Sequence, residues 1–253
     1  MKPLYNTILS YGAGIGSTAL LVAICNGNYA RADPKSTLVV FADTGVERPW
    51  TYHYLPVAKK YCKVNGIRFD IVRARYNLEN YVYYYGILPS RRMRWCTQKL
   101  KIQPIRYRAL REDVSIRYLQ LIGFDATEEN RTRKKPLFAN CTELYPLIEL
   151  GWDRRDCAHA ILRAGLPLPK KSACFCCPFQ RLSTFASVMR IFPDLAIRTK
   201  KMEEFANRNR NGKPPFYLFR EPVEQLLERT PEILYRASRR GTLLDDFGML
   251  NSL

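Results

Sequence analysis

The sequence predicts an α/β protein built on a doubly wound, mostly parallel sheet of five strands, followed by a helical, cysteine-rich C-terminal extension. Short apolar runs rich in β-branched residues alternate along the chain with longer stretches of helical periodicity. Such alternation is typical of a parallel sheet whose two faces are covered by helices. Several of the runs also end in glycine-containing turns, and ligands of doubly wound sheets bind beyond the carboxyl ends of the strands.

The predicted elements follow one another in chain order. Helices are expected from Ser17 to Cys25 and, after the second strand, up to a stop at Gly66. Beyond Pro178 the alternation gives way to helical and irregular sequence, with a Gly/Pro-rich loop at 208–216. The expected strands are residues 5–10, 37–42, 67–74, 115–123 and 142–150.

The composition points to an anionic partner. The 253 residues include 41 Lys and Arg against 23 Asp and Glu, a formal net charge of +18, and such a surplus attracts polyanions. One basic stretch, Arg91–Arg108, also carries Trp95 and Tyr107, and a second lies at Arg131–Lys135. Cations for phosphates and aromatic rings for bases are typical of a nucleic-acid groove, so DNA or RNA is an expected partner. The alternatives are neutralisation of a single nucleotide and a solubilising basic surface.

The chain is expected to be cytoplasmic, with no membrane association. Its N-terminal stretch has no apolar segment of signal-peptide length, and no run approaches the roughly 20 apolar residues of a membrane span. In a reducing compartment, eight cysteines are expected to act as metal ligands or catalytic thiols rather than as disulfides.

The first glycine turn, in "SYGAGIGSTALL", has the features of a phosphate-binding loop. Gly12, Gly14 and Gly16 let backbone N–H groups approach an anion, and Ser17 and Thr18 open a helix whose N-terminus favours negative charge. No lysine precedes Ser17 or Thr18, so the loop is not a Walker A motif, and its spacing differs from the dinucleotide pattern. A purely structural tight turn is the alternative.

Two further turns follow predicted strands and carry charged side chains. Asp43 and Glu47 would contact ribose hydroxyls or a cation, or would instead cap a turn and start a helix. Glu128, Glu129 and Arg131 follow Gly123 and form either an anion contact or a hydrated loop. Arg131 is the stronger candidate for an anion contact because its planar donors match phosphate or sulfate.

The cysteines cluster in "SACFCCPF", where Cys174 and Cys177 have the spacing that lets two thiolates reach one metal centre. Cys96 lies beside Arg94, Lys99 and Lys101, and these charges would lower its thiol pKa. Cys157 is the candidate fourth ligand, or else a small buried apolar residue. Four thiolates would complete a [4Fe-4S] cluster or a structural zinc site, and the spacing does not separate the two. Cys176 is a sulfur-carrying thiol, an alternative ligand or a residue without a role in the site, while Cys25, Cys62 and Cys141 are interpreted as structural.

Taken together, the motifs resemble the adenine nucleotide alpha hydrolase superfamily, and most closely its PAPS reductase branch. "SYGAGIGSTALL" is similar to the PP-loop of that superfamily, and "FADTGVERPWTYHYL" to the second-strand motif of the branch. "RMRWCTQKLKIQP" and "IGFDATEENR" are similar to its Arg/Cys/Lys segment and its fourth-strand turn. "YPLIELGWDRRDC" followed by "KSACFCCPF" resembles the cysteine-bearing tail of small microbial and phage PAPS reductase-like proteins. The resemblance covers roughly residues 5–180.

The resemblance implies an adenine nucleotide site, for ATP, APS or PAPS, beside a [4Fe-4S] cluster. Metal ligation is assigned to Cys96, Cys157, Cys174 and Cys177, and the catalytic roles to Cys176 and Arg131. One departure is Gly16, which stands where the superfamily has an aspartate and weakens any role in magnesium-dependent ATP cleavage. The implied nucleotide-binding residues are Ser10, Gly12, Gly14, Gly16, Ser17, Thr18, Asp43, Thr44, Gly45, Glu47, Lys101 and Gly123.

We therefore expect a PP-loop domain at residues 1–150 and a metal-binding, helical region at 151–253 packed on the same core. The expected function is that of a nucleotide-binding iron-sulfur enzyme of sulfur transfer or sulfonucleotide chemistry, with DNA or RNA as a candidate acceptor. One alternative is a zinc-stabilised nucleic-acid-binding or regulatory protein without catalysis. Another is a sulfonucleotide reductase that releases sulfite, but no cysteine follows Cys177 to serve as the mobile tail cysteine of such enzymes.

Overall fold

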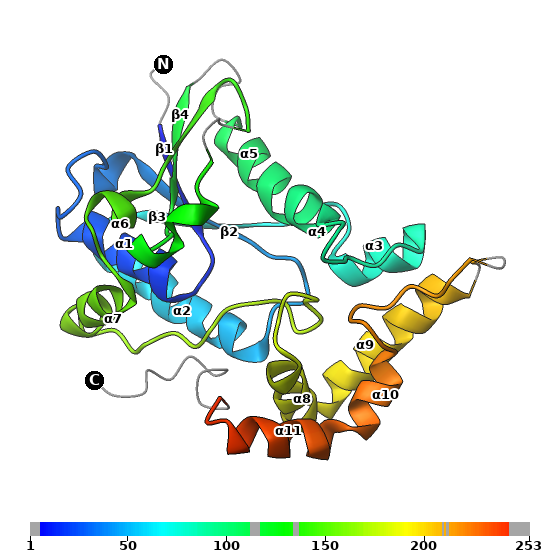
Figure 1. Ribbon diagram of the computed structural model, residues 1–253. Helices are drawn as coiled ribbons and strands as arrows, with labels where there is room; N and C mark the ends of the chain where they lie inside the picture. The colour runs from blue at the N-terminus through cyan, green and yellow to red at the C-terminus, as the bar shows by residue number, and fades with distance from the viewer. Residues whose placement is uncertain (1–5, 112–116, 134–136, 209, 211–212, 243–253) are drawn as a thin grey trace. The chain divides into compact units, whose positions relative to one another are not determined.

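A computed structural model describes residues 6–111, 117–133, 137–208, 210 and 213–242 of the chain (Figure 1). It divides into two compact units. Unit 1 comprises residues 1–42, 49–72 and 102–172, and unit 2 comprises residues 43–48, 73–101 and 173–253. The boundary expected at residue 150 does not coincide with this division, because 151–172 belong to unit 1 while two internal segments belong to unit 2.

Unit 1 is built on a parallel sheet of five strands in the order β3-β2-β1-β4-β5. The chain winds from β1 to β3 on one side and then crosses β1 to place β4 and β5 on the other, so the topology reverses between β1 and β4. The predicted doubly wound, five-stranded α/β class is confirmed. The strands are β1 (Thr7–Tyr11), β2 (Thr37–Ala42), β3 (Arg68–Val72), β4 (Tyr118–Ile122) and β5 (Cys141–Leu144).

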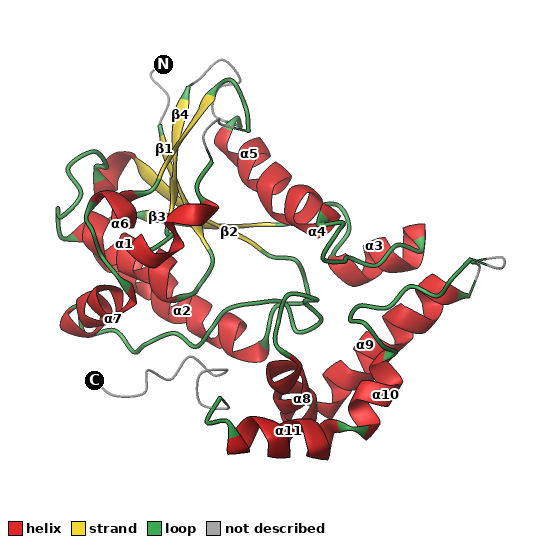
Figure 2. Cartoon of the chain, in the orientation of Figure 1, coloured by secondary structure: helices red, strands yellow, loops and turns green. Residues whose placement is uncertain are grey.

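The two faces of the sheet are covered by different helices (Figure 2). Leu9, Val39 and Leu121 lie in register on one face and pack in the same core as α1, α2 and α7. Ile8 and Val40 lie on the other face, in a smaller core with α5. β1 and β2 are almost entirely buried because apolar residues cover both of their faces, as expected of central strands in a parallel sheet.

The remaining elements of unit 1 begin and end at recognisable signals. Pro146 starts α6 directly after β5, so the extended segment expected at 142–150 is a short strand followed by a helical turn. Asp153 caps α7 by accepting the N–H groups of Arg155 and Asp156. These elements are α1 (Ile15–Cys25), η1 (Pro34–Ser36), α2 (Pro49–Val64), α5 (Gln103–Ala109), η3 (Ala126–Arg131), α6 (Pro146–Glu149) and α7 (Arg154–Arg163).

Unit 2 is helical, as expected of the region beyond Pro178. α9 packs against α3, α8 and α10, and α11 packs against α8. The π-helical turn η2 (Gln98–Ile102) follows α4 and carries Lys99 and Lys101. The helices of unit 2 are α3 (Leu78–Tyr85), α4 (Trp95–Thr97), α8 (Leu182–Ile191), α9 (Pro193–Asn207), α10 (Val223–Glu228) and α11 (Thr230–Arg239). Within the described ranges, no helix is long and apolar enough to cross a membrane.

Candidate functional site

The glycine loop of unit 1 joins β1 to α1 and directs its backbone donors at a single oxygen. The N–H groups of Gly12 and Gly14 donate to Ser17 Oγ over 3.2 and 3.3 Å, and this hydroxyl donates to the Gly14 carbonyl over 3.2 Å. Two N–H groups that converge on one oxygen at a helix N-terminus form the kind of cradle that holds an anionic oxygen. The Ser17 hydroxyl marks the position that such an oxygen would take.

The loop lies where the topology of the sheet reverses, between the carboxyl ends of β1 and β4. There the backbones of Gly16 and Gly123 touch. A Cβ atom placed on Gly16 would lie 2.2 Å from the Gly123 carbonyl oxygen, and one on Gly123 would lie 2.8 Å from the backbone of Gly16 and Ser17. No side chain fits at either position. The aspartate that the resemblance gives at residue 16 would therefore not fit this backbone arrangement.

The conformation of this loop is strained at one residue. Ala13 has a φ of 54°, the left-handed region that alanine rarely occupies, and it is buried. This conformation turns the chain so that the N–H groups on both sides of Ala13 point toward Ser17. The loop therefore keeps its donor geometry at a conformational cost, which is common at functional sites.

Ser10 and Thr18, two of the predicted nucleotide contacts, are engaged within unit 1. Ser10 Oγ accepts a hydrogen bond of 2.8 Å from the side-chain amide of Gln120, and the hydroxyls of Tyr11 and Thr18 are 3.0 Å apart. Thr18 is completely buried. These contacts anchor the strand and the helix that flank the loop, so both residues have a structural role.

Arg131, predicted to contact an anion, lies at the end of η3. Its guanidinium forms an ion pair with Glu128 and stacks over the Phe124 ring, with its central carbon 4.2 Å from the ring centroid. Phe124 in turn stacks on Tyr145 with the ring centroids 5.7 Å apart. The side chain of Arg131 is about half exposed, and it has donors for an external anion as well as for Glu128.

The acidic turn at 43–48 belongs to unit 2 and is shaped by its own side chains. Asp43 accepts the Gly45 N–H over 2.8 Å and pairs with Arg73 over 2.8 Å. Gly45 has a φ of 77°, and a Cβ atom there would lie 2.7 Å from Asn77 Cβ, so only glycine fits. The carbonyl of Thr44 accepts the N–H of Leu78. The Asp43 carboxylate therefore fixes this turn, which is the structural alternative raised by the sequence.

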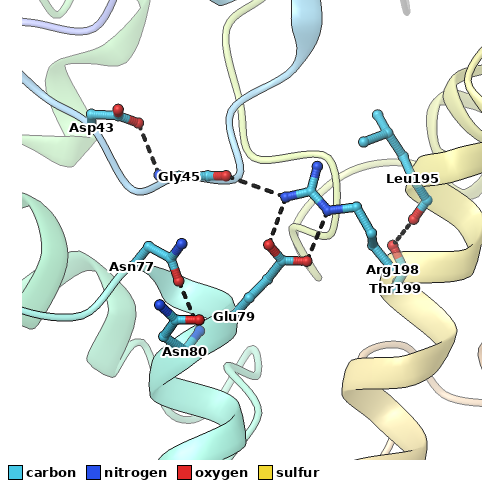
Figure 3. A network of polar contacts seen from close by, with 8 residues as sticks. All are labelled: Asp43, Gly45, Asn77, Glu79, Asn80, Leu195, Arg198 and Thr199. Carbon is cyan, nitrogen blue, oxygen red and sulfur yellow. Dashed lines mark hydrogen bonds and ion pairs between the residues drawn. The ribbon is translucent and has the colours of Figure 1, made fainter.

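Arg198 of α9 holds the acidic turn and α3 together (Figure 3). Its guanidinium donates to both carboxylate oxygens of Glu79, over 2.9 and 2.6 Å, and to the Gly45 carbonyl over 3.4 Å. It also lies over the Phe175 ring, 4.8 Å from the centroid. Sequence reasoning missed Arg198, because nothing in the local pattern distinguishes it from the other basic residues of α9.

The cysteine loop pairs with the acidic turn through the backbone. Glu47 and Cys174 form an antiparallel bridge, with hydrogen bonds from Arg48 N to Ala173 O and from Phe175 N to Val46 O. Cys174 Sγ lies 3.5 Å from Thr44 Oγ1 and 3.6 Å from Glu47 Oε1. The C-x-x-C motif is thus attached to the turn that carries the predicted nucleotide contacts Thr44, Gly45 and Glu47.

An ion pair between a partly exposed lysine and a buried carboxylate supplies the charge beside Cys174. Lys101 Nζ lies 2.8 Å from Glu47 Oε1, and only about 2% of the Glu47 side chain is exposed. Burial lowers the pKa of Lys101, but the charges of Glu47 and Cys174 outweigh it, so the pKa is raised overall and the ammonium form is favoured. Lys101 and Glu47 were both predicted as site residues, but their partnership was not.

The remaining thiols of unit 2 differ in exposure. Cys96 and Cys177 are partly exposed, whereas Cys176 is completely buried. Burial raises the pKa of Cys174 and of Cys176, and burial together with the charge of Cys177 raises the pKa of Cys96. Lys101 acts to lower the pKa of Cys96, as predicted, but burial outweighs this attraction, so the pKa is raised overall.

Cys157, the predicted fourth ligand, belongs to unit 1. It lies on α7 in the apolar core, with no exposed surface, and burial raises its pKa to about 12. These are the surroundings of a structural cysteine, the alternative that the sequence left open. Across the described residues, no group of three or more His, Cys, Asp or Glu side chains is gathered closely enough to hold a metal ion.

Comparison with known proteins gives relatives at low identity. No protein-family model matches the chain. An uncharacterized protein of Methanocaldococcus jannaschii, MJ0066, is 27% identical over 187 residues, which is 69% of this chain and 38% of that protein. The chain thus spans less than half of the length of this relative.

A PAPS reductase is among the similar solved structures. The enzyme of that name from Candida auris, in a phosphate complex, shares 16% identity over 67% of this chain and 76% of its own, with a TM-score of 0.44. The U34-tRNA thiolase NcsA from Methanococcus maripaludis, solved with its [4Fe-4S] cluster, shares 17% identity over 89% of this chain and 81% of its own, also at 0.44. The chain is similar to both.

Proposed function

We propose that this chain is a nucleotide-binding sulfur-transfer enzyme. An adenine nucleotide would place its phosphates at the glycine loop of unit 1, and a cysteine-ligated iron-sulfur cluster would form in unit 2. The observation that carries the proposal is the convergence of the Gly12 and Gly14 N–H groups on one oxygen position, at the topological switch point of the sheet.

The glycine loop would bind phosphate mainly through its backbone. The first N–H groups of α1 have no intrahelical partner, and the helix N-terminus favours a negative charge. No acidic side chain lies in the first turn of α1 to compete with the phosphate. Because Gly16 cannot carry a carboxylate, the loop itself would not hold a magnesium ion, and the proposal does not require ATP cleavage.

In unit 2, Cys96, Cys174 and Cys177 are the proposed cluster ligands. Thiolates are the usual ligands of iron-sulfur clusters, and the charge of Cys177 acts on both Cys96 and Cys174. Among the described residues these side chains are not gathered closely enough to hold a metal ion, so cluster binding would have to draw them together. When bound, the cluster would supply iron sites at which sulfur can be held. Cys157 is left out of the set because it is a core residue of unit 1.

The chain's own charges have a defined part in this arrangement. The Lys101 ammonium beside Glu47 and Cys174 would offset the negative charge of a thiolate-ligated centre. Glu47 accepts from the Thr44 hydroxyl over 3.1 Å and so fixes the turn that faces Cys174. Cys176 is not proposed as the sulfur carrier, because a completely buried thiol with a raised pKa is a poor nucleophile.

Metal analysis after purification without oxygen tests the cluster. We expect about four iron and four sulfide per chain, with loss of both in Cys174→Ala, Cys177→Ala and Cys96→Ala. Cys157→Ala is the matched control and should keep its iron. Absence of iron and sulfide from the wild-type chain, or full loss in the control only, would overturn the ligand assignment.

Nucleotide binding is tested at Gly14. Gly14→Asp and Gly14→Asn introduce side chains of the same shape, and the nearest obstacle to either is the flexible end of Ser172, 2.9 Å from the added Cβ. The Asp variant alone brings a negative charge to the proposed phosphate position. We expect it to bind ATP, APS and PAPS at least 10-fold more weakly than the Asn variant in calorimetric titrations. Equal affinities would contradict the loop assignment.

A zinc-stabilised nucleic-acid-binding protein without catalysis is the second candidate. The contact between Gly16 and Gly123 favours it, since this contact excludes an acidic loop residue. One zinc per chain without sulfide would support this candidate. A sulfonucleotide reductase finds less support, because its thiol would have to be the buried Cys176, and release of sulfite from APS or PAPS would be its signature.

A further inference from the structure

Unit 2 contains an open cavity of about 670 Å³ that the proposed nucleotide and cluster sites do not use. Three chain segments line it: residues 90–92, 178–182 and 216–221. Arg91 fastens the first segment to the second, because its Nε donates to the Pro178 carbonyl over 3.0 Å. Pro178 directly follows the proposed cluster ligand Cys177, so the cavity begins at the end of the cysteine loop.

The charge of the cavity is strongly positive. Arg91, Arg92, Arg181 and Arg220 line it, and its one carboxylate, Glu221, is paired with Arg229 over 2.7 Å. Arg92 and Arg220 are exposed, and neither has an ion-pair partner among the residues that the structure describes. A concave surface with such a surplus of guanidinium groups is suited to an anion, and planar guanidinium donors match phosphate.

The third segment also brings aromatic rings to the cavity wall, from Phe216, Tyr217 and Phe219. Phe219 packs on Phe185 of α8, with the centroids 4.7 Å apart, while the Tyr217 ring lies on the partly exposed surface. Proteins that bind single-stranded nucleic acids present aromatic rings beside arginines, because bases stack on the rings while phosphates contact the cations.

The aromatic segment is held in place before any ligand arrives. Asn207 exchanges two hydrogen bonds with the backbone of Phe216, over 2.7 and 3.0 Å. The buried carboxylate of Glu203 accepts the N–H groups of Leu218 and Val223, over 3.0 and 2.6 Å. A loop anchored at three of its residues loses little conformational entropy on binding, which favours affinity.

We propose that this cavity binds one unstacked nucleotide of a single-stranded nucleic acid, with its base on Tyr217 and its phosphates on Arg92 and Arg220. Bases in a duplex are stacked and cannot enter a cavity, so a single-stranded segment is the form that fits. The assignment of this nucleic acid as the sulfur acceptor rests on the proposed function. Binding itself does not, and it is measurable whether or not a cluster forms.

Fluorescence anisotropy with a labelled single-stranded 12-mer, as RNA and as DNA, tests the cavity at low salt. We expect Arg92→Ala and Arg220→Ala each to weaken binding at least 5-fold, and the double variant about 30-fold. Arg190→Ala removes another exposed arginine, on α8 outside the cavity, and should change the affinity less than 2-fold. Equal losses in the cavity and control variants would mean non-specific attraction and would overturn the proposal.

The stacking contact has its own pair of variants. Tyr217→Leu should weaken binding 5- to 50-fold, whereas Tyr217→Phe keeps the ring and should restore it. Two competitors test whether the site is specific for a nucleic-acid strand. If unlabelled AMP or polyglutamate displaced the labelled 12-mer at the same concentration as unlabelled oligonucleotide does, the proposal would be contradicted. Iron content measured on every variant separates the two proposals. A variant that loses nucleic-acid binding but keeps its iron has a defect in the cavity alone. A chain that binds nucleic acid but contains no iron contradicts the cluster proposal and leaves the cavity proposal intact.

Discussion

The two units of the molecule place their cysteines in opposite surroundings. Cys62 and Cys157 of unit 1 lie in the apolar core, and Cys141 lies in the smaller core on the other face of the sheet. In unit 2, by contrast, Cys174 touches Thr44 and Glu47, and the charge of Lys101 acts on it. The same residue type serves as an apolar filler in one unit and as a polar, charge-coupled group in the other.

This difference distinguishes a candidate site cysteine from a structural one by its polar partners. Spacing in the sequence grouped Cys157 with the C-x-x-C motif, but spacing does not show which charged side chains lie around a thiol. Beside Cys174 lies the Glu47–Lys101 pair, which brings an ammonium group to the thiol, whereas the charges that act on Cys157 are mainly the carboxylates of Asp125, Asp156 and Asp153. The cation near Cys174, rather than cysteine spacing, therefore marks the candidate site.

Thiol reactivity should separate the two units most strongly. Burial raises the pKa of Cys157 from its ordinary value of 9.0 to about 12, which lowers its thiolate fraction at pH 8 about a thousandfold. We expect alkylation of Cys157 in the folded chain to be slower than in the unfolded chain by at least that factor, while the partly exposed Cys177 is labelled first. Mass spectrometry of timed samples measures both rates.

The same shift has a consequence for stability. Because the folded-state pKa of Cys157 is the higher one, its contribution to stability is complete below about pH 9 and is lost as the pH rises from 9 toward 12. Cys157→Ala should remove that part of the pH dependence of the unfolding free energy. An unchanged pH profile in the variant, or rapid labelling of Cys157 in the folded chain, would break the comparison between the units.

The glycine loop of unit 1 should be the region least tolerant of an added methyl group. Gly16→Ala would press its Cβ against the Gly123 carbonyl, and we expect a loss of about 3 kcal/mol in the free energy of unfolding. Gly12→Ala is the control, since the nearest atom to its Cβ would be Ser17 Oγ at 3.9 Å, and it should cost less than about 1 kcal/mol. Urea denaturation gives both values, and similar losses would refute the backbone contact.

In unit 2 the corresponding structural element is a side-chain clamp. Arg198→Met removes the two-point pair with Glu79 and the hydrogen bond to Gly45, and we expect it to cost about 1–2 kcal/mol, allowing for the 38% exposure of the arginine. Arg236→Met breaks an exposed pair with Glu232 and should cost less than about 0.5 kcal/mol. If Arg198→Met lowered the free energy of unfolding no more than Arg236→Met, the proposed role of Arg198 in fixing the acidic turn would be refuted.

The smallest effect is expected at the strained residue of the glycine loop. Ala13→Gly relieves a φ of 54° and should stabilise the chain by about 0.5–1 kcal/mol, since glycine takes this conformation without steric cost. The same change at Ala23, inside α1, should destabilise it by about 1 kcal/mol or more. Thermal unfolding of both variants checks the opposite signs, and a destabilised Ala13→Gly would contradict the strain.

The fold was predictable from the sequence because its strands are marked by apolar, β-branched runs and its turns by glycine. The strand predicted at 37–42 has the bounds of β2, and the helix expected to stop at Gly66 ends two residues earlier, at Val64. The fifth segment was harder to predict, because Leu144 and Leu147 are equally apolar, and only Pro146 indicates where a strand gives way to a helix.

The sequence offered candidate site residues but not the contacts that they make. Ser10 and Thr18 were assigned to a nucleotide, whereas Ser10 is engaged by Gln120, 110 positions away, and Thr18 by Tyr11, seven positions away. The pairs of Lys101 with Glu47 and of Arg198 with Glu79 join residues 54 and 119 positions apart. Local patterns reflect propensity and periodicity, while such pairs depend on the tertiary path of the chain. The division into two units was missed for the same reason.

The discontinuity of the two units has a consequence for anyone who would dissect the protein. Unit 2 is assembled from three separate stretches of chain, the shortest of which, Asp43–Arg48, is inserted between β2 and α2 of unit 1. No single truncation releases either unit, and a cut at residue 150 would remove α7 from unit 1 and the cysteine loop from the acidic turn. Isolating either half by recombinant expression would therefore require grafting or circular permutation rather than shortening.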